Sequence, residues 1–343
     1  DLPNELIINK VKGAFLHTTE KVLKVQKNES EAYVIDRIAY DQFLFNRVAD
    51  SKINIEQDKV ISLDLEKGIL KCKSGKIISS KIIVGADGHN SIVSKAMNNK
   101  YRAYNASQFL IKINDFNFKN FRKNENVNDY VDIYASSEIF PGFLWVIPVG
   151  ENLYRVGLFS NGDYKIQNKL LDSFLKDNFS NENYEIIEKY KGSIPIFDKQ
   201  KKIVKNRAIL IGDAASQIKP TTGGGLLIGF DSCKIASKNI LAALNEDTSL
   251  LNNYSKEFNK KYSKELNYQI KVQKTLSILS NEDLNYFFDK LKINDCEKLI
   301  SEHGDMDKQS ILVKEFLKRG LIFKIIPSLF IKKILRIWNI KEK

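Results

Sequence analysis

Two short loops carry residues whose types and spacing could bind a cofactor. In the first, the apolar run at residues 82–84 leads into Gly85, Ala86, Asp87 and Gly88. An apolar run of this kind is typical of a buried strand, and small residues after it let a ligand approach the backbone. Asp87 could accept hydrogen bonds from sugar hydroxyls or fix the loop amides. A plain strand-turn-helix, with Asp87 as a cap and Ser91 capping the next helix, explains this loop alone equally well.

The second loop gives a stronger signal. The apolar run at residues 208–211 leads into Gly212 and Asp213, and three consecutive glycines at 223–225 then precede a long predicted helix. Three glycines in a row lose much conformational entropy on folding, so a helix cap alone does not explain them. Amides at a helix N-terminus carry partial positive charge and suit a phosphate or an anionic ring edge. A ligand-binding function is therefore the better interpretation of this loop.

The two loops must be positioned by a common element. Because each follows a buried strand, we expect both at the carboxyl edge of one parallel sheet, where they would hold one long dinucleotide cofactor from two sides. None of the 17 glycines makes a GxGxxG motif, since Ile228 stands where a third glycine would follow Gly223 and Gly225. The fingerprint of a first dinucleotide-binding βαβ unit is therefore absent.

Hydrophobic periodicity predicts the remaining elements. Asp41 suits the N-terminal end of the first predicted helix, and a turn is expected at residues 28–30. Helix breaks are expected at 303–305 and at Pro327. Strands are predicted at 6–8, 14–16, 22–25, 54–56, 60–63, 69–72, 82–84, 108–113, 130–134, 143–147, 153–159 and 208–211, and helices at 41–49, 170–176, 226–244 and beyond 250.

The predicted fold class is α/β (α+β overall): a Rossmann-like domain, incomplete at its N-terminus, with a β-rich domain and a helical C-terminal region. The first domain is discontinuous, because its strand-and-helix pieces flank a β-rich insertion. We expect the nucleotide-binding domain at 28–100 and 203–245, the β-rich substrate domain at 1–27 and 101–202, and the helical region at 246–343.

Composition excludes several classes of protein. The chain has 343 residues, 43% hydrophobic and 28% charged, which is enough for packed cores rather than disorder. Its formal net charge is +12, but the lysines are spread along the chain and no nucleic-acid-binding motif accompanies them. Neither the three cysteines nor the three histidines have metal-ligand spacing. We therefore expect no nucleic acid, no metal and a reducing environment.

Several motifs together resemble one family. The loops at Asp87-Gly88 and Gly212-Asp213 resemble the two conserved motifs of the flavoprotein hydroxylase superfamily. Residues 219–225, Lys-Pro-Thr-Thr-Gly-Gly-Gly, look most like the geranylgeranyl reductases, including the digeranylgeranylglycerophospholipid reductases. Further matches lie at 9–14, 33–37, 40–41 and 304–307, so the likeness covers nearly the whole chain.

The resemblance implies FAD as the cofactor. It would place Asp213 at the ribityl or pyrophosphate part, Asp87 near the pyrophosphate and the glycine-rich helix start at the pyrimidine edge. Arg37 would be a phosphate partner, although a surface arginine is nearly as good an interpretation. The expected cofactor-binding residues are thus Arg37, Asp87, Gly88, Gly212, Asp213, Gly223, Gly224, Gly225 and Leu226.

The resemblance also implies a substrate site. Family members carry a Tyr-x-Trp-x-Phe-Pro element, and residues 143–148 read Phe-Leu-Trp-Val-Ile-Pro. Phe143 lacks the tyrosine hydroxyl, which puts a polar contact to the substrate in doubt, but the apolar lining suits an isoprenoid chain. We expect Phe143, Trp145 and Pro148 to contact the substrate; a core strand is the competing interpretation. No acid–base residue is assigned.

The functional hypothesis is an FAD-dependent reductase of carbon–carbon double bonds in prenyl chains of membrane lipids. Its electron donor is open between NAD(P)H and ferredoxin. The alternatives are a flavin-dependent monooxygenase or halogenase, and a degenerate, non-enzymatic, membrane-associated binding protein. Because family members begin with the GxGxxG unit and this sequence lacks both that unit and an initial Met, we expect it to be a fragment of a longer product.

The C-terminal stretch 321–340 has apolar residues at helical spacing, with Lys324, Lys332, Lys333 and Arg336 among them. These charges exclude a membrane span. A basic amphipathic helix with a tryptophan suits the surface of an anionic membrane, whereas a docked helix completing the fold is the competing interpretation. We expect a cytoplasmic protein with peripheral contact to the inner face of the membrane through this stretch.

Overall fold

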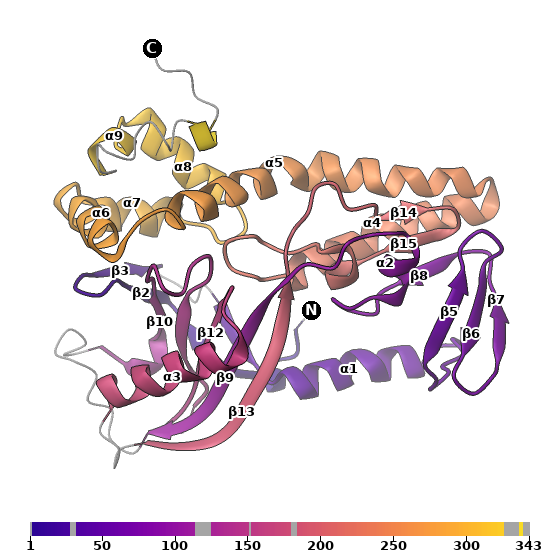
Figure 1. Cartoon of the computed structure of the whole chain (residues 1–343), viewed down its shortest axis with the longest axis horizontal. Coiled ribbons are helices and arrows are strands. Elements are labelled where there is room, and N and C mark those ends of the chain that lie inside the picture. The colour runs from indigo at the N-terminus through magenta and orange to yellow at the C-terminus, as the bar shows by residue number, and fades with distance from the viewer. Residues whose placement is uncertain are drawn as a thin grey trace. The chain divides into compact units, whose positions relative to one another are not determined.

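The computed structural model describes residues 2–27, 32–113, 125–150, 152–179, 184–325 and 336–338 (Figure 1). The chain divides into two compact units, each assembled from separate segments. Unit 1 comprises Asp1–Asn54, Asn105–Gly192 and Gln273–Lys343, and unit 2 comprises Ile55–Tyr104 and Ser193–Val272. The stretch 246–343, expected as one helical region, is thus shared between the two units, and residues 37–54 belong to unit 1.

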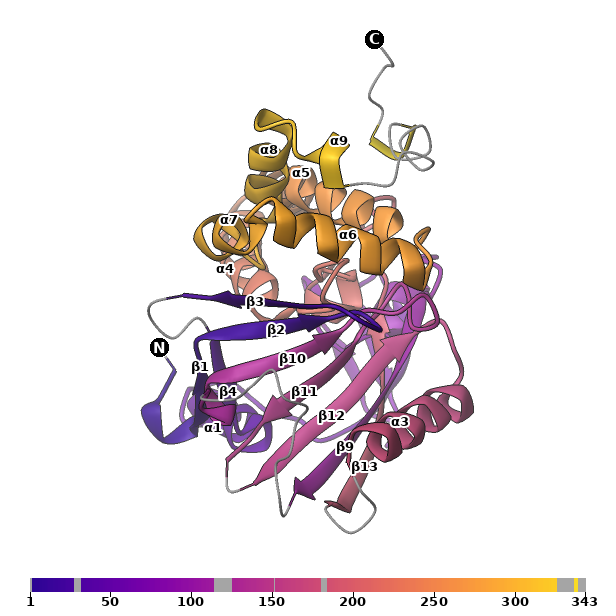
Figure 2. The same ribbon diagram turned by 90° about the vertical axis from the view of Figure 1, so that its left-hand side faces the viewer.

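A seven-stranded sheet is the frame of unit 1. Its order is β13-β9-β12-β11-β10-β2-β3, and Figure 2 shows these strands side by side. Strands β2 and β10 are parallel, whereas β2–β3, β10–β11, β11–β12 and β12–β9 are antiparallel. A two-stranded ribbon, β1–β4, accompanies the sheet. The strands are β1 (Ile7–Val11), β2 (Gly13–His17), β3 (Val22–Gln26), β4 (Ala32–Ile35), β9 (Ala103–Ile113), β10 (Tyr130–Tyr134), β11 (Leu144–Pro148), β12 (Leu153–Ser160) and β13 (Tyr184–Pro195).

The two faces of this sheet differ because side chains alternate along a strand. In β11, Leu144 and Val146 are buried on one face of the sheet. They belong to the same core cluster as Leu171 and Leu175 of α3. Trp145 points to the other face and is only half-buried. Helices α6 and α7 pack on β3 at the other end of the sheet. The helices of unit 1 are α1 (Arg37–Ala49), α3 (Tyr164–Asn178), α6 (Asn281–Ile293), α7 (Cys296–His303), α8 (Gln309–Lys318) and α9 (Ile322–Ile325), with short 3₁₀ turns η1 (Asn4–Leu6) and η3 (Val127–Asp129).

Unit 2 contains two three-stranded sheets, ordered β14-β15-β8 and β5-β6-β7. Its core joins the buried strands β8 and β15 to one face of α4 and to Tyr254 and Phe258 of α5. The elements are β5 (Val60–Asp64), β6 (Ile69–Cys72), β7 (Ile77–Ser79), β8 (Ile83–Gly85), α2 (Ile92–Ala96), β14 (Val204–Lys205), β15 (Ala208–Leu210), η4 (Gly212–Ala215), α4 (Leu226–Asn245), η5 (Thr248–Leu251) and most of α5 (Asn252–Leu276).

The sequence located most of these elements, with four corrections. The helix expected at 41–49 begins at Arg37, because Asp36 accepts hydrogen bonds from the amides of Ile38 and Ala39 and so caps it one turn earlier. No strand forms at 54–56, while β4, β7, β13 and the two-residue β14 were missed. Helix α3 begins at Tyr164 rather than near Leu170, because Asp163 caps it. The turn at 28–30 and the break at Pro327 lie outside the described residues.

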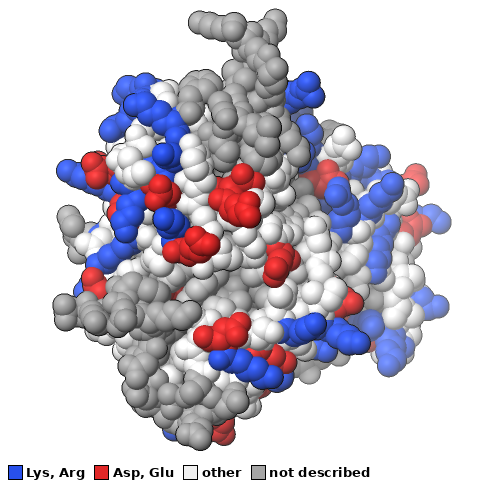
Figure 3. All heavy atoms as spheres, turned by 60° about the vertical axis from the view of Figure 1, so that its left-hand side comes forward, with Lys and Arg blue, Asp and Glu red and all other residues white. Residues whose placement is uncertain are grey.

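Among the residues that the structure describes, no helix is long and apolar enough to span a bilayer. Most of the predicted amphipathic stretch 321–340 falls outside the described part of the chain. Its described residues pack on the protein: Ile325 is buried in a cluster with Phe316, and Trp338 donates a hydrogen bond from Nε1 to Thr275 Oγ1 at 3.0 Å. On the face shown in Figure 3, basic side chains occur in several groups with acidic side chains among them.

Candidate functional site

The two glycine–aspartate loops follow strands of one parallel pair, as the sequence predicted, and these strands are direct neighbours. Strand β8 pairs in parallel with β15, with Gly85 opposite Leu210. The amide of Ile211 then donates to the carbonyl of Gly85 at 3.0 Å. Both loops therefore lie at the carboxyl edge of this sheet in unit 2. Ligands bind at this edge in open α/β sheets.

Gly88 and Gly212 leave room at this edge for a ligand. Both have a left-handed backbone, with φ of +75° and +63°, and a Cβ built on either would meet no heavy atom within 4 Å. A side chain at either position would be strained and would also occupy that open space. Two backbone segments that a ligand can approach closely are what a nucleotide cofactor requires.

Asp87 has a structural role within its loop. Its Oδ2 accepts a hydrogen bond from the amide of Ile92 at 2.7 Å, and Ser91 Oγ accepts one from Ser94 at 2.8 Å. These are the interactions of a helix N-terminus, so Asp87 fixes the loop amides, which is one of the two roles that its position allowed. Its second role, at a sugar or phosphate group, stays a prediction.

Asp213 lies beside the start of helix α4. A Cβ built on Gly225 would lie 3.3 Å from Asp213 Oδ1 and 3.0 Å from Ile218, so a larger residue there would have to displace one of these side chains slightly. Gly225 is the N-cap and supplies no side-chain cap, so the first amides of α4, from Leu226 onward, retain their partial positive charge. Asp213 and Leu226 are both exposed.

The glycine run folds back on Lys219. The amide of Gly223 donates to the Lys219 carbonyl, and the amide of Lys219 donates to the Gly224 carbonyl, both at 2.9 Å. A Cβ on Gly224 would lie 2.8 Å from Lys219 Cε and 3.4 Å from its Nζ. An ammonium group therefore lies next to the helix start, where it adds positive charge.

A second lysine, Lys201, lies at the Asp213 turn. Lys201 Nζ donates to Ser216 Oγ at 2.9 Å, and Ser216 is buried with a left-handed φ of +55°. Burial lowers the pKa of Lys201, and the nearby carboxylates of Asp198 and Asp213 oppose that effect only in part. Lys201 precedes the motif in an unremarkable lysine-rich segment, so no sequence signal marked it.

Gln217 and Tyr254 were also missed. The amide of Gly212 donates to Gln217 Oε1 at 2.8 Å, and Gln217 Nε2 donates to the Tyr254 hydroxyl at 2.7 Å. That hydroxyl donates to the Leu210 carbonyl at 2.9 Å. Burial raises the pKa of Tyr254 to about 12. The network therefore links the end of β15 and the glycine after it to helix α5.

The remaining predicted residues belong to unit 1. Arg37 is the first residue of α1, is exposed, and forms an ion pair with Asp41 at 3.0 Å. Phe143 and Trp145 lie close together, with ring centroids 5.9 Å apart in an edge-on arrangement. Pro148 is buried and alternates onto the opposite face of β11 from Trp145. Phe143 and Trp145 therefore share a surface, which Pro148 does not join.

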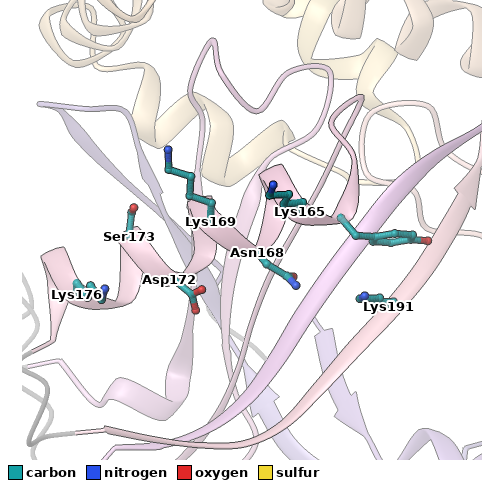
Figure 4. A pocket seen from close by; sticks show the side chains of 8 residues that line it. Lys165, Asn168, Lys169, Asp172, Ser173, Lys176 and Lys191 are labelled. Carbon is teal, nitrogen blue, oxygen red and sulfur yellow. The ribbon is translucent and has the colours of Figure 1, made fainter.

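A polar groove also lies on unit 1, between α3 and β13 (Figure 4). Its lysines make it a poor site for an apolar chain, and α3 covers the sheet face opposite Trp145. The groove is lined by Tyr164, Lys165, Asn168, Lys169, Asp172, Ser173, Lys176 and Lys191.

Comparison with known proteins defines the class. The sequence profile of the FAD binding domain family matches residues 64–264, which is more than half of the chain. The protein therefore belongs to the FAD binding domain family, and it is an FAD-dependent oxidoreductase. The predicted mixed α/β fold, the FAD cofactor and the resemblance to the geranylgeranyl reductase family are confirmed.

Particular relatives are archaeal. An uncharacterized protein of Methanocaldococcus jannaschii is 32% identical, over 94% of this chain and 84% of its own length. Digeranylgeranylglycerophospholipid reductase 2 of Methanococcoides burtonii is 28% identical, over 80% of this chain and 70% of its own. A geranylgeranyl bacteriochlorophyll reductase-like structure from Thermoplasma acidophilum has the same fold, with a TM-score of 0.76, 21% identity and coverage of 93% of this chain and 85% of that one.

Proposed function

We propose that this flavoenzyme reduces carbon–carbon double bonds in geranylgeranyl-type chains of membrane lipids. The observation that carries the proposal is the pairing of two kinds of surface in one chain. Unit 2 has open space and uncapped helix amides at Gly212, Asp213 and the start of α4, where we place FAD, and unit 1 has an apolar aromatic face at Phe143 and Trp145. The digeranylgeranylglycerophospholipid reductases among its relatives support this substrate class.

In this proposal, bound FAD that the electron donor has reduced would supply a hydride to one carbon of the double bond, and solvent or the reduced flavin would supply the proton to the other carbon. The side chains and backbone of the protein bind and orient the cofactor and the substrate. The open turns at Gly88 and Gly212 accept the cofactor, while the α4 amides, Lys219 and Lys201 provide positive charge for its anionic groups. Phe143 and Trp145 give an apolar surface on which a prenyl chain can lie without polar groups being stripped of water.

The electron donor is proposed to be NAD(P)H or reduced ferredoxin, which the experiment compares directly. Purified protein is reconstituted with FAD, bleached anaerobically with each donor, and mixed with a geranylgeranyl phospholipid in detergent micelles. Recovery of the oxidised flavin spectrum, with a mass gain of two hydrogens per reduced bond, supports the proposal. Reoxidation only on admission of oxygen would favour the monooxygenase or halogenase alternative. A protein that takes up no FAD would favour the non-enzymatic binding protein.

Peripheral membrane contact through 321–340 and a place at the inner face of the membrane stay proposals. A lipid substrate is the reason to keep them. Flotation with anionic phospholipid vesicles tests the contact: binding that is unchanged when residues 321–343 are deleted would count against it. The packing of Trp338 on Thr275 favours a docked tail for the described part of this stretch.

A further inference from the structure

Three residues on neighbouring strands of unit 1 form a row. Trp145 of β11 lies opposite Gly157 of β12, and Gly157 lies opposite Gln108 of β9. Directly opposite residues present their side chains on the same face of a sheet. The row therefore crosses the face that bears Trp145, opposite the face that α3 covers.

Gly157 makes room for the indole of Trp145. A Cβ built on Gly157 would lie 2.5 Å from Cζ2 and 2.7 Å from Cε2 of Trp145, and 2.8 Å from the Ser107 carbonyl oxygen. No side chain fits there while the indole keeps its place. A glycine inside a strand is otherwise unfavourable, and close approach by another group is a recognised reason for one.

Gln108 fixes the far edge of the same ring. The indole Nε1 donates to Gln108 Oε1 at 3.1 Å. Since one edge of the indole lies on Gly157 and its nitrogen reaches the next strand, the ring extends along the sheet across β12 instead of standing away from it. The half-buried Phe143 lies beside the indole, and its ring packs against the buried Phe159, with the ring centroids 5.2 Å apart.

We propose that Gly157 and Gln108 are positioning residues that hold Trp145 across the sheet as a fixed apolar floor for the substrate chain. The inference rests on the proposed function and deepens it. A prenyl chain is flexible and carries several similar double bonds, so a floor with one orientation limits which bond is presented. Small misplacements of a reacting group lower rates strongly, by about 100-fold for 1 Å.

The test uses Trp145 as its own reporter. The chain has two tryptophans, so a Trp338→Phe background leaves Trp145 alone. In that background we compare Gly157→Ala, Gln108→Leu and Gln108→Glu, the last of which keeps an acceptor for the indole N–H. Gly192→Ala is the matched control, because Gly192 lies in β13 of the same sheet and a Cβ there meets nothing within 4 Å.

Two measurements are made on each variant: acrylamide quenching of Trp145 fluorescence, and kcat and KM for a geranylgeranyl phospholipid in detergent micelles. We expect Gly157→Ala and Gln108→Leu to increase quenching about twofold and to lower kcat/KM about tenfold, equal to about 1.4 kcal/mol, with the Kd for FAD unchanged. Gln108→Glu should restore both values, and Gly192→Ala should alter neither. If Gly157→Ala folds poorly, Trp145→Phe in the same chain should restore part of its stability, because it relieves the clash with the indole and leaves only the close approach to the Ser107 carbonyl oxygen.

Unchanged quenching would overturn the inference, and so would changed quenching with unchanged kcat/KM. Failure of the proposed function is distinct: the parent protein would then reduce no prenyl lipid, although the quenching differences would still be measured.

Discussion

The side-chain amide of Gln217 donates a hydrogen bond to the hydroxyl of Tyr254 at 2.7 Å, and both residues are buried in unit 2. The other end of the same amide accepts from Gly212, the glycine next to Asp213. A helix more than forty residues along the chain thus sets the conformation of the turn proposed to hold FAD. Buried polar networks of this kind are rigid when every member is paired.

Tyr254→Phe should lower the free energy of unfolding by about 1–3 kcal/mol, because the Leu210 carbonyl and Gln217 Nε2 both lose a partner while buried. Urea denaturation of the parent and the variant measures this change, and the affinity of each for FAD is measured in parallel. The control is Tyr262→Phe on the same helix, whose hydroxyl bonds Asp231 near the surface. An equal loss in both variants would contradict a special role for the buried network.

Ionisation of the Tyr254 hydroxyl should make the stability of the protein depend on pH. The pKa of Tyr254 is raised from about 10 to about 12, so its contribution is complete below pH 10 and is lost as pH rises toward 12, where the unfolded chain ionises first. Between pH 9 and pH 11 the free energy of unfolding of the parent should fall by about 1.4 kcal/mol more than that of Tyr254→Phe. Urea midpoints of both proteins at the two pH values test this. A stability difference that stays constant with pH would refute it.

Gly212→Ala should weaken FAD binding beyond its effect on folding. The left-handed backbone makes alanine unfavourable by about 1–2 kcal/mol, and the new Cβ would also enter the open space at the site. Gly75→Ala is the matched control: its φ is +90°, it also has open space, and it lies in the β6–β7 turn. Thermal denaturation should show a similar loss of stability for the two variants. Flavin fluorescence titration should show weaker FAD binding for Gly212→Ala alone.

Lys201→Met should raise the Kd for FAD about tenfold, equal to about 1.4 kcal/mol, because it removes a partly buried cation from the Asp213 turn. Lys201 is charged at pH values below its pKa, and burial lowers that pKa. As the pH rises, FAD affinity should therefore begin to fall at a lower pH than it would if Lys201 had the pKa of an exposed lysine. Lys201→Arg should bind FAD with little dependence on pH across that range, since arginine stays protonated. Titrations from pH 7 to pH 10 check both; a Kd in Lys201→Met equal to that of the parent would exclude the role.

The sequence alone determined the parts of this protein that depend on local rules. Apolar runs followed by Gly–Asp predicted the buried strands β8 and β15, their loops and the start of α4, because burial of a strand and the sterics of glycine are properties of neighbouring residues. The apolar pattern likewise predicted the strand at 143–147, which is β11.

The residues from distant segments that complete these sites are set by strand pairing and helix packing. Strand register sets Gly157 and Gln108 beside Trp145, and the packing of α5 on β15 sets Tyr254 beside Gln217. No local pattern encodes either contact, since a hydrogen bond between segments far apart in sequence exists only after the segments have paired or packed. For the same reason Lys201, in a segment that looks like ordinary lysine-rich surface, becomes a half-buried cation only when the chain folds.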